Sequence, residues 1–303
     1  MDSPDGILII ANPTSGKGRH PKLLEHVVEH LRADGADVEI VYTQARGDAQ
    51  RLARTAAENA SRHPRCIAVS GGDGTIQEVV NGLVPLRETL GDDSPTLGII
   101  PSGRCNDLAH ALKLPTEPRA VAHVLLSREP TAIDLGRVNG RYFCTVATMG
   151  FDAAVSRYVD DMRMPLTGTV AYLYGAAITL LRYRPIEVKL TGDFGTHEGR
   201  VFLASTANTA TYGGSIPIAP GASPTDGVFH LCIISHIPVI SRLPMLCRAT
   251  RGTHIHRPEV HLLETQTVKI ETPTPQELWA DGEHVADTPA TITIERGAIR
   301  VHT

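Results

Sequence analysis

The sequence lacks the features that mark nucleic-acid-binding proteins. Its formal net charge is −4, whereas a surface that binds nucleic acid is usually basic. Aromatic residues make up only 4% of the chain, and they do not interleave with basic residues as a base-stacking platform would require. We therefore expect no nucleic acid among the partners of this protein.

Cysteine and long apolar stretches are also scarce. The 303 residues include five widely scattered cysteines, an odd number without a C-x-x-C pair, which argues against a disulfide framework and a zinc site. No apolar stretch is long enough to span a bilayer, and no basic-then-apolar leader begins the chain. These absences predict a cytoplasmic protein with no transmembrane segment.

Strand and helix patterns alternate in the first third of the chain. Apolar runs predict strands, and apolar stripes at helical spacing separate them, as in the stretch from Leu23 to Leu31. This order predicts a parallel sheet with covering helices, and in such sheets ligands bind at the carboxyl ends of the strands. The loops that begin at Asn12, Gly71 and Pro101 lie at those ends. The expected strands are Ile7–Ala11, Val38–Tyr42, Cys66–Ser70 and Leu97–Ile100.

Short strands separated by turns dominate after about Thr131. Long helical patterns are rare there, apart from Val170–Leu181 and about Val239–Thr250. A chain of this length suggests two domains, and the change of pattern predicts that the second is a β-rich sandwich. The expected strands are Tyr142–Thr148, Ile186–Leu190, Val201–Ser205, Val228–Ile234, Val268–Thr272 and Ala290–Ile294.

A glycine-rich turn, Ser70–Thr75, joins an apolar run to a helical pattern. Such a turn presents backbone N–H groups at a helix N-terminus, where a phosphate can bind. Its carboxylate, Asp73, would repel a phosphate unless it held Mg²⁺ or received the proton of an attacking hydroxyl. The simpler alternative is a strand-to-helix turn with a capping aspartate. The spacing excludes a dinucleotide fingerprint, since Gln77 stands where the third glycine would fall.

Four further segments accompany this turn. They are Asn12–Gly18, Pro101–Leu108, Tyr212–Pro220 with Asp226-Gly227 after it, and Asp281–Glu283; the stretch Gly150–Asp152 fits the same pattern. Taken in this order with the glycine turn, they resemble the diacylglycerol kinase catalytic-domain family over nearly the whole chain. That family includes bacterial lipid kinases and sphingosine kinases, and it is related in fold to NAD kinases.

The resemblance implies a Rossmann-like, NAD-kinase-like α/β nucleotide domain followed by a C-terminal β-sandwich. It implies a nucleotide-binding domain at 1–132, a β-rich lipid-substrate domain at 133–289, and a segment at 290–303 that returns to the first domain. The implied activity is ATP-dependent phosphorylation of a lipid hydroxyl, with diacylglycerol as the default substrate and ATP and Mg²⁺ as cofactors. The lipid would be met at a membrane surface by transient association, and a homodimer is left open. The alternatives are an NAD kinase-like enzyme and a catalytically weak nucleotide-binding regulator.

The resemblance also assigns roles to residues. Glu283 matches the family's proposed catalytic base, and Asp73 competes for that role while otherwise organising the Mg²⁺-nucleotide. Asp152 is expected to meet the polar head of the lipid. Asp226 matches an aspartate that binds a structural Mg²⁺ with nearby main-chain oxygens, which here would belong to Ser223 and Val228. The expected nucleotide contacts are Asn12, Ser15, Gly16, Lys17, Thr43, Gly71, Gly72, Asp73, Gly74, Thr75, Gly103, Arg104 and Asn106.

Arg104 departs from the family pattern, which usually has a nucleotide-contacting threonine at this position. Arginine is larger, permanently charged, and able to bind a phosphate through two N–H groups at once. Two outcomes follow from the sequence: Arg104 replaces the hydroxyl contact with a phosphate contact, or it points outward and weakens ATP binding.

The apolar segment Val170–Leu181 also has two interpretations. A helix of this composition is more often part of a core. In a lipid kinase it could instead form an exposed patch that reaches the bilayer, with Arg163, Arg182 and Arg184 near anionic headgroups.

Overall fold

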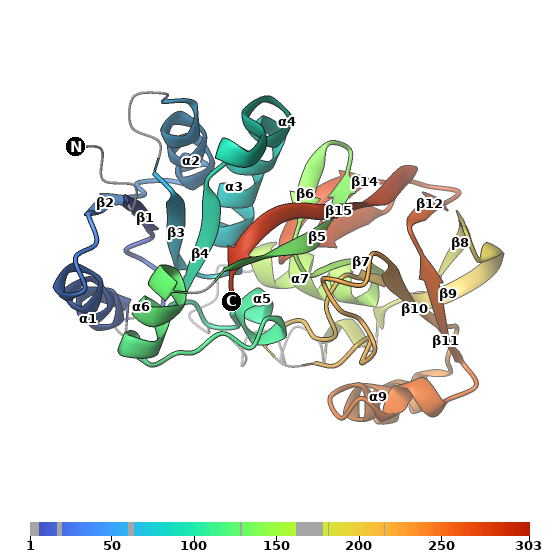
Figure 1. Cartoon of the computed structure of the whole chain (residues 1–303). Coiled ribbons are helices and arrows are strands. Elements are labelled where there is room, and N and C mark those ends of the chain that lie inside the picture. The colour runs from blue at the N-terminus through green and yellow to red at the C-terminus, as the bar shows by residue number, and fades with distance from the viewer. Residues whose placement is uncertain are drawn as a thin grey trace. The chain divides into compact units, whose positions relative to one another are not determined.

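The chain divides into two compact units, Met1–Ile133 with Gly297–Thr303, and Asp134–Arg296. We call them unit 1 and unit 2. The structure, a computed structural model shown in Figure 1, describes residues 6–16, 20–59, 64–127, 129–161, 178–180, 182–214 and 216–303. The sequence predicts domain boundaries after residues 132 and 289, and these boundaries remain a prediction.

Unit 1 is built on a parallel sheet in the strand order β2-β1-β3-β4. Every residue of β1, β3 and β4 is buried, as is typical of parallel strands whose two faces are covered by helices. At the edge beyond β4, Val301 pairs in parallel with Leu97. The strands are β1 (Ile7–Ala11), β2 (Val38–Tyr42), β3 (Cys66–Gly71), β4 (Thr96–Pro101) and the end of β15 (Ala290–His302).

Helices cover both faces of this sheet (Figure 1). The helices α1 (His20–Ala33) and α6 (Pro118–Ser127) share an apolar cluster with Ile7, Ile9 and Ala11 of β1. Because side chains alternate along a strand, Leu8 and Ile10 point to the opposite face. The remaining helices are α2 (Asp48–Glu58), α3 (Asp73–Leu83), α4 (Arg87–Leu90) and α5 (Asp107–Ala111), with 3-10 turns at Val84–Leu86 and Gly91–Asp93.

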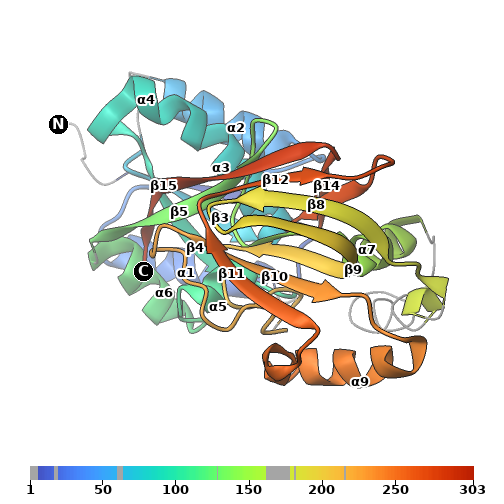
Figure 2. The same ribbon diagram turned by 90° about the vertical axis from the view of Figure 1, so that its right-hand side faces the viewer.

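Unit 2 is an antiparallel β structure organised around the long strand β9 (Gly195–Ala207). The first half of β9 pairs with β8 and its second half with β10, so the three strands lie side by side (Figure 2). The second half of β9 also pairs with β7. The other pairs are β10 with β11, β8 with β12, β12 with β15, β7 with β13, β13 with β14, and β5 with β6. The strand bounds are β5 (Pro130–Val138), β6 (Arg141–Phe143), β7 (Val146–Gly150), β8 (Ile186–Gly192), β10 (Phe229–Ser235), β11 (Val260–Thr265), β12 (Thr267–Glu271), β13 (Glu277–Ala280) and β14 (Glu283–Asp287).

The largest apolar cluster of unit 2 includes two stacked rings. Phe143 and Phe229 are fully buried, and their ring centroids lie 6.0 Å apart. A second apolar cluster lies beneath two helices, α7 (Phe151–Asp161) and α9 (Val239–Ala249), and a 3-10 turn, Thr253–His256, follows α9. Within the described ranges, no helix has both the length and the apolar character needed to cross a membrane.

The structure contradicts one of the strands that the sequence predicts. The apolar run Tyr142–Thr148 forms two strands, β6 and β7, that are interrupted at Cys144 and Thr145. The N–H groups of those two residues donate to the carboxylate of Asp281, at 2.7 and 2.9 Å, instead of to a neighbouring strand. The expected segment Val170–Leu181 lies outside the described residues except at 178–180.

Candidate functional site

Three loops at the carboxyl ends of the unit 1 strands are joined by backbone hydrogen bonds. The N–H of Asn12 donates to the carbonyl of Ser70 at 2.9 Å, and the N–H of Ser102 donates to Gly71 at 3.3 Å. On the other side of β1, the N–H of Thr43 donates to Ala11 at 2.9 Å. The loops that the sequence places at one edge of the sheet therefore lie side by side.

Two glycines allow the loops after β3 and β4 to touch. A Cβ atom on Gly103 would lie 2.4 Å from the Cα of Gly72, and one on Gly72 would lie 3.3 Å from the Cα of Gly103. Gly71 is equally constrained, since a Cβ there would lie 2.7 Å from the Cβ of Thr75. Packing of backbone on backbone therefore requires glycine at position 103 and leaves little room at position 72, while the Thr75 side chain restricts position 71.

The start of α3 has the groups that a phosphate would need. Gly72 is its N-cap and has extended backbone, and no side chain caps the helix there. The first N–H groups of a helix have no acceptor within the helix, and the N–H of Asp73 interacts with its own carboxylate, so those of Gly74 and Thr75 suit an anion. Each observation fits the expected phosphate-binding role of this turn.

The loop after β1 contributes Asn12 and Ser15 to the same place. The Asn12 amide donates to the Thr75 hydroxyl at 3.2 Å, while its oxygen accepts from the N–H and the hydroxyl of Thr14. The hydroxyl of Ser15 would lie 3.7 Å from a Cβ on Gly72. Gly16 has a φ of 69°, a left-handed conformation that favours glycine. Lys17 lies outside the described residues.

The loop after β4 is stiffened by its own asparagine. The side-chain oxygen of Asn106 accepts from the N–H of Gly103 at 2.9 Å, and its amide donates to the Gly103 carbonyl at 3.2 Å. Asn106 is buried and has a φ of 52°. Arg104, within this clasped loop, is exposed.

Asp73 faces the next helix. Its carboxylate accepts from the N–H of Leu108 at 3.4 Å, at the start of α5. Burial raises the pKa of the Asp73 carboxyl, and the backbone N–H groups of Leu108, Asp107 and Asn106 oppose that rise. The carboxylate therefore links the glycine turn to the loop after β4 and is held there in a partly desolvated state.

A cavity that the sequence does not indicate lies beside two of the expected nucleotide contacts. Its volume is about 600 Å³, and its lining includes Pro13, which follows Asn12, and Tyr42, which precedes Thr43. Leu24 and Val28 of α1 form part of its wall. Tyr42, at the end of β2, lies in this wall with its ring exposed, which the sequence alone did not show.

In unit 2, Glu283 stands on a tight hairpin between β13 and β14. Asp281 and Gly282 have φ values of 51° and 82°, as in a type I′ turn, and Glu283 pairs with Ala280. The Asp281 carboxylate fixes this hairpin, because it accepts from the N–H and hydroxyl of Thr145 at 2.9 and 2.6 Å. Asp281, which the sequence interpretation noted only as part of the motif, thus ties the hairpin to the residue before β7.

Asp152 is the second residue of α7 and is buried. It follows the Gly150 end of β7, whereas Ala280, the partner of Glu283, pairs with Ala147 near the other end. Ala147 and Gly150 are three residue steps apart along the strand, a distance of roughly 10 Å. The two residues expected to act on the lipid therefore stand toward opposite ends of β7.

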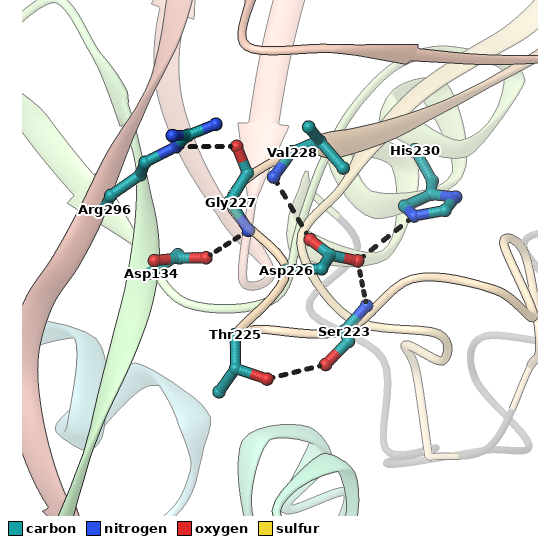
Figure 3. A network of polar contacts seen from close by, with 8 residues as sticks. All are labelled: Asp134, Ser223, Thr225, Asp226, Gly227, Val228, His230 and Arg296. Carbon is teal, nitrogen blue, oxygen red and sulfur yellow. Dashed lines mark hydrogen bonds and ion pairs between the residues drawn. The ribbon is translucent and has the colours of Figure 1, made fainter.

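Asp226 belongs to a network of polar contacts in unit 2 (Figure 3). One carboxylate oxygen accepts from the N–H of Val228 at 3.1 Å, and the other accepts from the N–H of Ser223 at 3.2 Å and contacts the His230 ring at 3.3 Å. Two further contacts hold the loop: the Asp134 carboxylate accepts from the N–H of Gly227 at 2.7 Å, and Arg296 donates to the Gly227 carbonyl at 3.1 Å.

This network bears on the expected structural Mg²⁺. Ser223 and Val228 direct N–H groups toward Asp226, and a cation cannot use N–H groups as ligands. The described residues contain no group of three or more His, Cys, Asp or Glu side chains placed to hold a metal. Both carboxylate oxygens of Asp226 already accept hydrogen bonds, and the Ser223 carbonyl accepts from the N–H of Asp226, so the structural Mg²⁺ at this loop stays a prediction.

Comparison with known proteins identifies the family. Residues 6–138 match the diacylglycerol kinase catalytic domain, and residues 145–303 match the YegS C-terminal NAD kinase beta sandwich-like domain. A Bacillus subtilis protein named diacylglycerol kinase is 34% identical over 277 residues, which cover 91% of this chain and 89% of that protein. The chain belongs to the diacylglycerol kinase family. The expected fold class, an NAD-kinase-like α/β domain with a C-terminal β-sandwich, is confirmed.

Two further relatives support this assignment to the diacylglycerol kinase family. A Mycobacterium tuberculosis protein of the same name is 33% identical over 97% of this chain and 94% of its own length. The solved structure of a candidate diacylglycerol kinase from Bacillus anthracis str. Sterne superposes with a TM-score of 0.82 at 25% identity, covering 98% of this chain and 95% of that one. The chain is thus a kinase of a lipid kinase family, and membership implies use of ATP.

The position of Asp73 predicts an unusual dependence of stability on pH. A carboxyl whose pKa is raised on folding contributes stability that is present below its unfolded pKa and is lost as pH rises through its folded pKa. Asp73→Asn stays neutral at every pH, so its free energy of unfolding should exceed that of the wild type at pH 7. The difference should close as pH falls through the folded pKa, as measured by urea denaturation between pH 4 and 7.

Asp48 provides the control with the opposite sign. Its pKa is lowered, chiefly by the N–H of Gln44 and by Arg51, so Asp48→Asn should be less stable than the wild type at pH 7. If Asp73→Asn is also less stable than the wild type at pH 7, the carboxylate is favoured in the ionised form and our account of this site is wrong.

Proposed function

We propose that this protein transfers the γ-phosphoryl group of ATP to a lipid hydroxyl, with diacylglycerol as substrate and phosphatidic acid as product. The observation that supports this most strongly is the packing of the loops after β1, β3 and β4 around the open N-terminus of α3. A helix N-terminus of this kind suits a phosphate. The names of the relatives support the choice of lipid.

Each candidate residue has a role in the proposed phosphoryl transfer. The expected nucleotide contacts in unit 1 hold the phosphates, and Lys17 offsets their charge. Glu283 accepts the proton of the lipid hydroxyl. The oxygen of that hydroxyl then forms a bond to the γ-phosphorus of ATP, and the bond between the γ-phosphorus and the oxygen that leaves with ADP breaks. We favour Glu283 over Asp73 as the base because Asp73 already serves as an acceptor for the start of α5. Asp152 is proposed to meet the polar head of the lipid.

The same proposal includes the remaining expectations from the sequence. The nucleotide-binding domain would be 1–132 and the lipid-substrate domain 133–289, with 290–303 returning to the first. The protein would act in the cytoplasm and associate transiently with a membrane, and a homodimer is compatible with this function. Mg²⁺ would accompany ATP and also occupy the site at Asp226.

Incubation of the purified protein with radiolabelled ATP and Mg²⁺ tests this function against its alternatives. We expect label on short-chain diacylglycerol in detergent micelles. Label on NAD instead would indicate an NAD kinase, and label on neither would indicate a nucleotide-binding regulator.

Glu283→Gln keeps the shape of the side chain but loses its basicity, so it should lower turnover roughly 10²-fold or more with ATP affinity little changed. Near-normal turnover in this variant would move the base role to Asp73 or elsewhere.

Arg104 is expected to bind a nucleotide phosphate in place of the family threonine's hydroxyl contact. Its exposure on a loop that Asn106 holds rigid leaves the guanidinium able to meet a ligand. A charge-assisted contact contributes about 1.5–3 kcal/mol, so Arg104→Ala should weaken ATP binding roughly tenfold or more, and Arg104→Thr should recover part of the loss. Calorimetric titration of ATP measures this, with the exposed Arg119→Ala as the control. Unchanged affinity in Arg104→Ala would show that the side chain stays in solvent.

Asp226 is expected to bind a structural Mg²⁺ that is separate from the nucleotide metal. Thermal denaturation at increasing Mg²⁺ without nucleotide should raise the Tm of the wild type and leave that of Asp226→Asn unchanged, because a ligand stabilises only the state that binds it. His230→Gln serves as a control, since it removes a contact of Asp226 and not the carboxylate. An equal Mg²⁺ effect on the wild type and Asp226→Asn would remove this site from the proposal.

A further inference from the structure

The helix α9 presents an apolar face to solvent. Val239, Ile240 and Leu243 are 52%, 87% and 61% exposed, although large apolar side chains are usually buried. Pro244 and Cys247 are exposed beside them, so the apolar residues follow a helical spacing along most of the helix. We call Val239, Ile240, Leu243, Pro244 and Cys247 the outer face of α9.

The opposite side of α9 is firmly held, so this exposure is not the result of a loosely packed helix. Met245 and Ala249 are buried, and Met245 belongs to the same apolar cluster as Ile234 of β10. Arg242 is buried and donates to the carbonyls of Leu180 and Tyr183, at 2.7 and 3.0 Å. These contacts fix which side chains face outward.

Positive charge lies at the C-terminal end of the same helix. Arg248 and Arg251 are exposed there. No Asp or Glu occurs anywhere between residues 236 and 258. An apolar helical face with arginines at its margin and no acidic residue is the pattern of a helix that lies in the interface of an anionic membrane.

The size of the outer face argues against a second copy of the chain as its occupant. An eleven-residue helix is about 16 Å long, so its outer face measures no more than a few hundred Å². A stable protein–protein interface buries roughly 800 Å² on each partner. A bilayer has no such requirement, because it can receive a few apolar side chains together with arginines that contact its headgroups.

We infer that the outer face of α9, with Arg248 and Arg251, docks the protein on the surface of an anionic lipid bilayer. This inference rests on the proposed function, since a kinase that acts on a membrane lipid must meet the bilayer. Docking through α9 concentrates the enzyme on its substrate and leaves the chemistry of the phosphate-binding loops unchanged. The sequence offered Val170–Leu181 for the same role; only residues 178–180 of that segment are described, and the Leu180 carbonyl accepts from Arg242 of α9.

Vesicle flotation tests the docking surface. The wild type should bind vesicles that contain phosphatidylglycerol and phosphatidylcholine more strongly than vesicles of phosphatidylcholine alone. Ile240→Ser with Leu243→Ser removes the apolar side chains without adding charge and should weaken binding to both by tenfold or more. Arg248→Ala with Arg251→Ala should weaken binding to the anionic vesicles alone, by about fivefold per arginine, which corresponds to about 1 kcal/mol for each.

A matched control separates docking from net charge. Arg137→Ala with Arg200→Ala removes two exposed arginines from other parts of unit 2, where each forms an ion pair with a glutamate. It should leave anionic vesicle binding within twofold of the wild type. If this control weakens binding to anionic vesicles as much as Arg248→Ala with Arg251→Ala does, binding depends only on the net charge of the protein. The proposed docking surface is then wrong.

Activity on short-chain diacylglycerol in micelles distinguishes the failure of this inference from that of the proposed function. All α9 variants should keep wild-type activity there and lose activity on vesicles. A wild type that is inactive in micelles overturns the proposed function. If the wild type is active in micelles but the Ile240→Ser, Leu243→Ser variant binds vesicles normally, the inference is wrong. It is also wrong if light scattering shows that the wild type is a dimer and that this variant is a monomer.

Discussion

The contact between the backbones of Gly72 and Gly103 constrains everything else at the edge of the unit 1 sheet. It brings the loops after β3 and β4 closer than any side chain would allow. The Asn106 clasp shapes one of these loops and the Asn12 contact with Thr75 orients the other. A ligand at the start of α3 would therefore meet a preorganised surface, with little ordering entropy left to lose on binding.

Aspartates that accept backbone N–H groups recur through both units. Asp73 accepts from the start of α5, Asp281 from the interruption between β6 and β7, and Asp226 from its own turn. A carboxylate that accepts several N–H groups holds a loop in one conformation without a large apolar core beneath it. Asp73 and Asp226 resemble catalytic or metal-binding positions in the sequence, so a motif alone does not separate the two roles.

The parts of the fold with strong local signals were predictable from the sequence. Apolar runs such as Cys66–Val69 are typical of parallel strands covered by helices on both faces, and the Asp281-Gly282 pair favours a tight hairpin. The expectation failed at Cys144 and Thr145, because their pairing is set by Asp281, more than 130 residues away. In the candidate site, the sequence indicated the glycines. It could not show that Gly72 and Gly103 touch, that Arg104 is exposed, or that α9 turns Ile240 outward, because each depends on tertiary packing.

The strand β15 takes part in both units, and this has a consequence for biosynthesis. Its first residues pair with β12 in unit 2, while Val301 pairs with β4 and the His302 ring contacts the Thr96 hydroxyl at 2.8 Å. Until residues 297–303 have left the ribosome, the edge of β4 exposes unpaired backbone groups of the kind that drive strand-to-strand aggregation. The first unit therefore lacks its last strand throughout synthesis of the second.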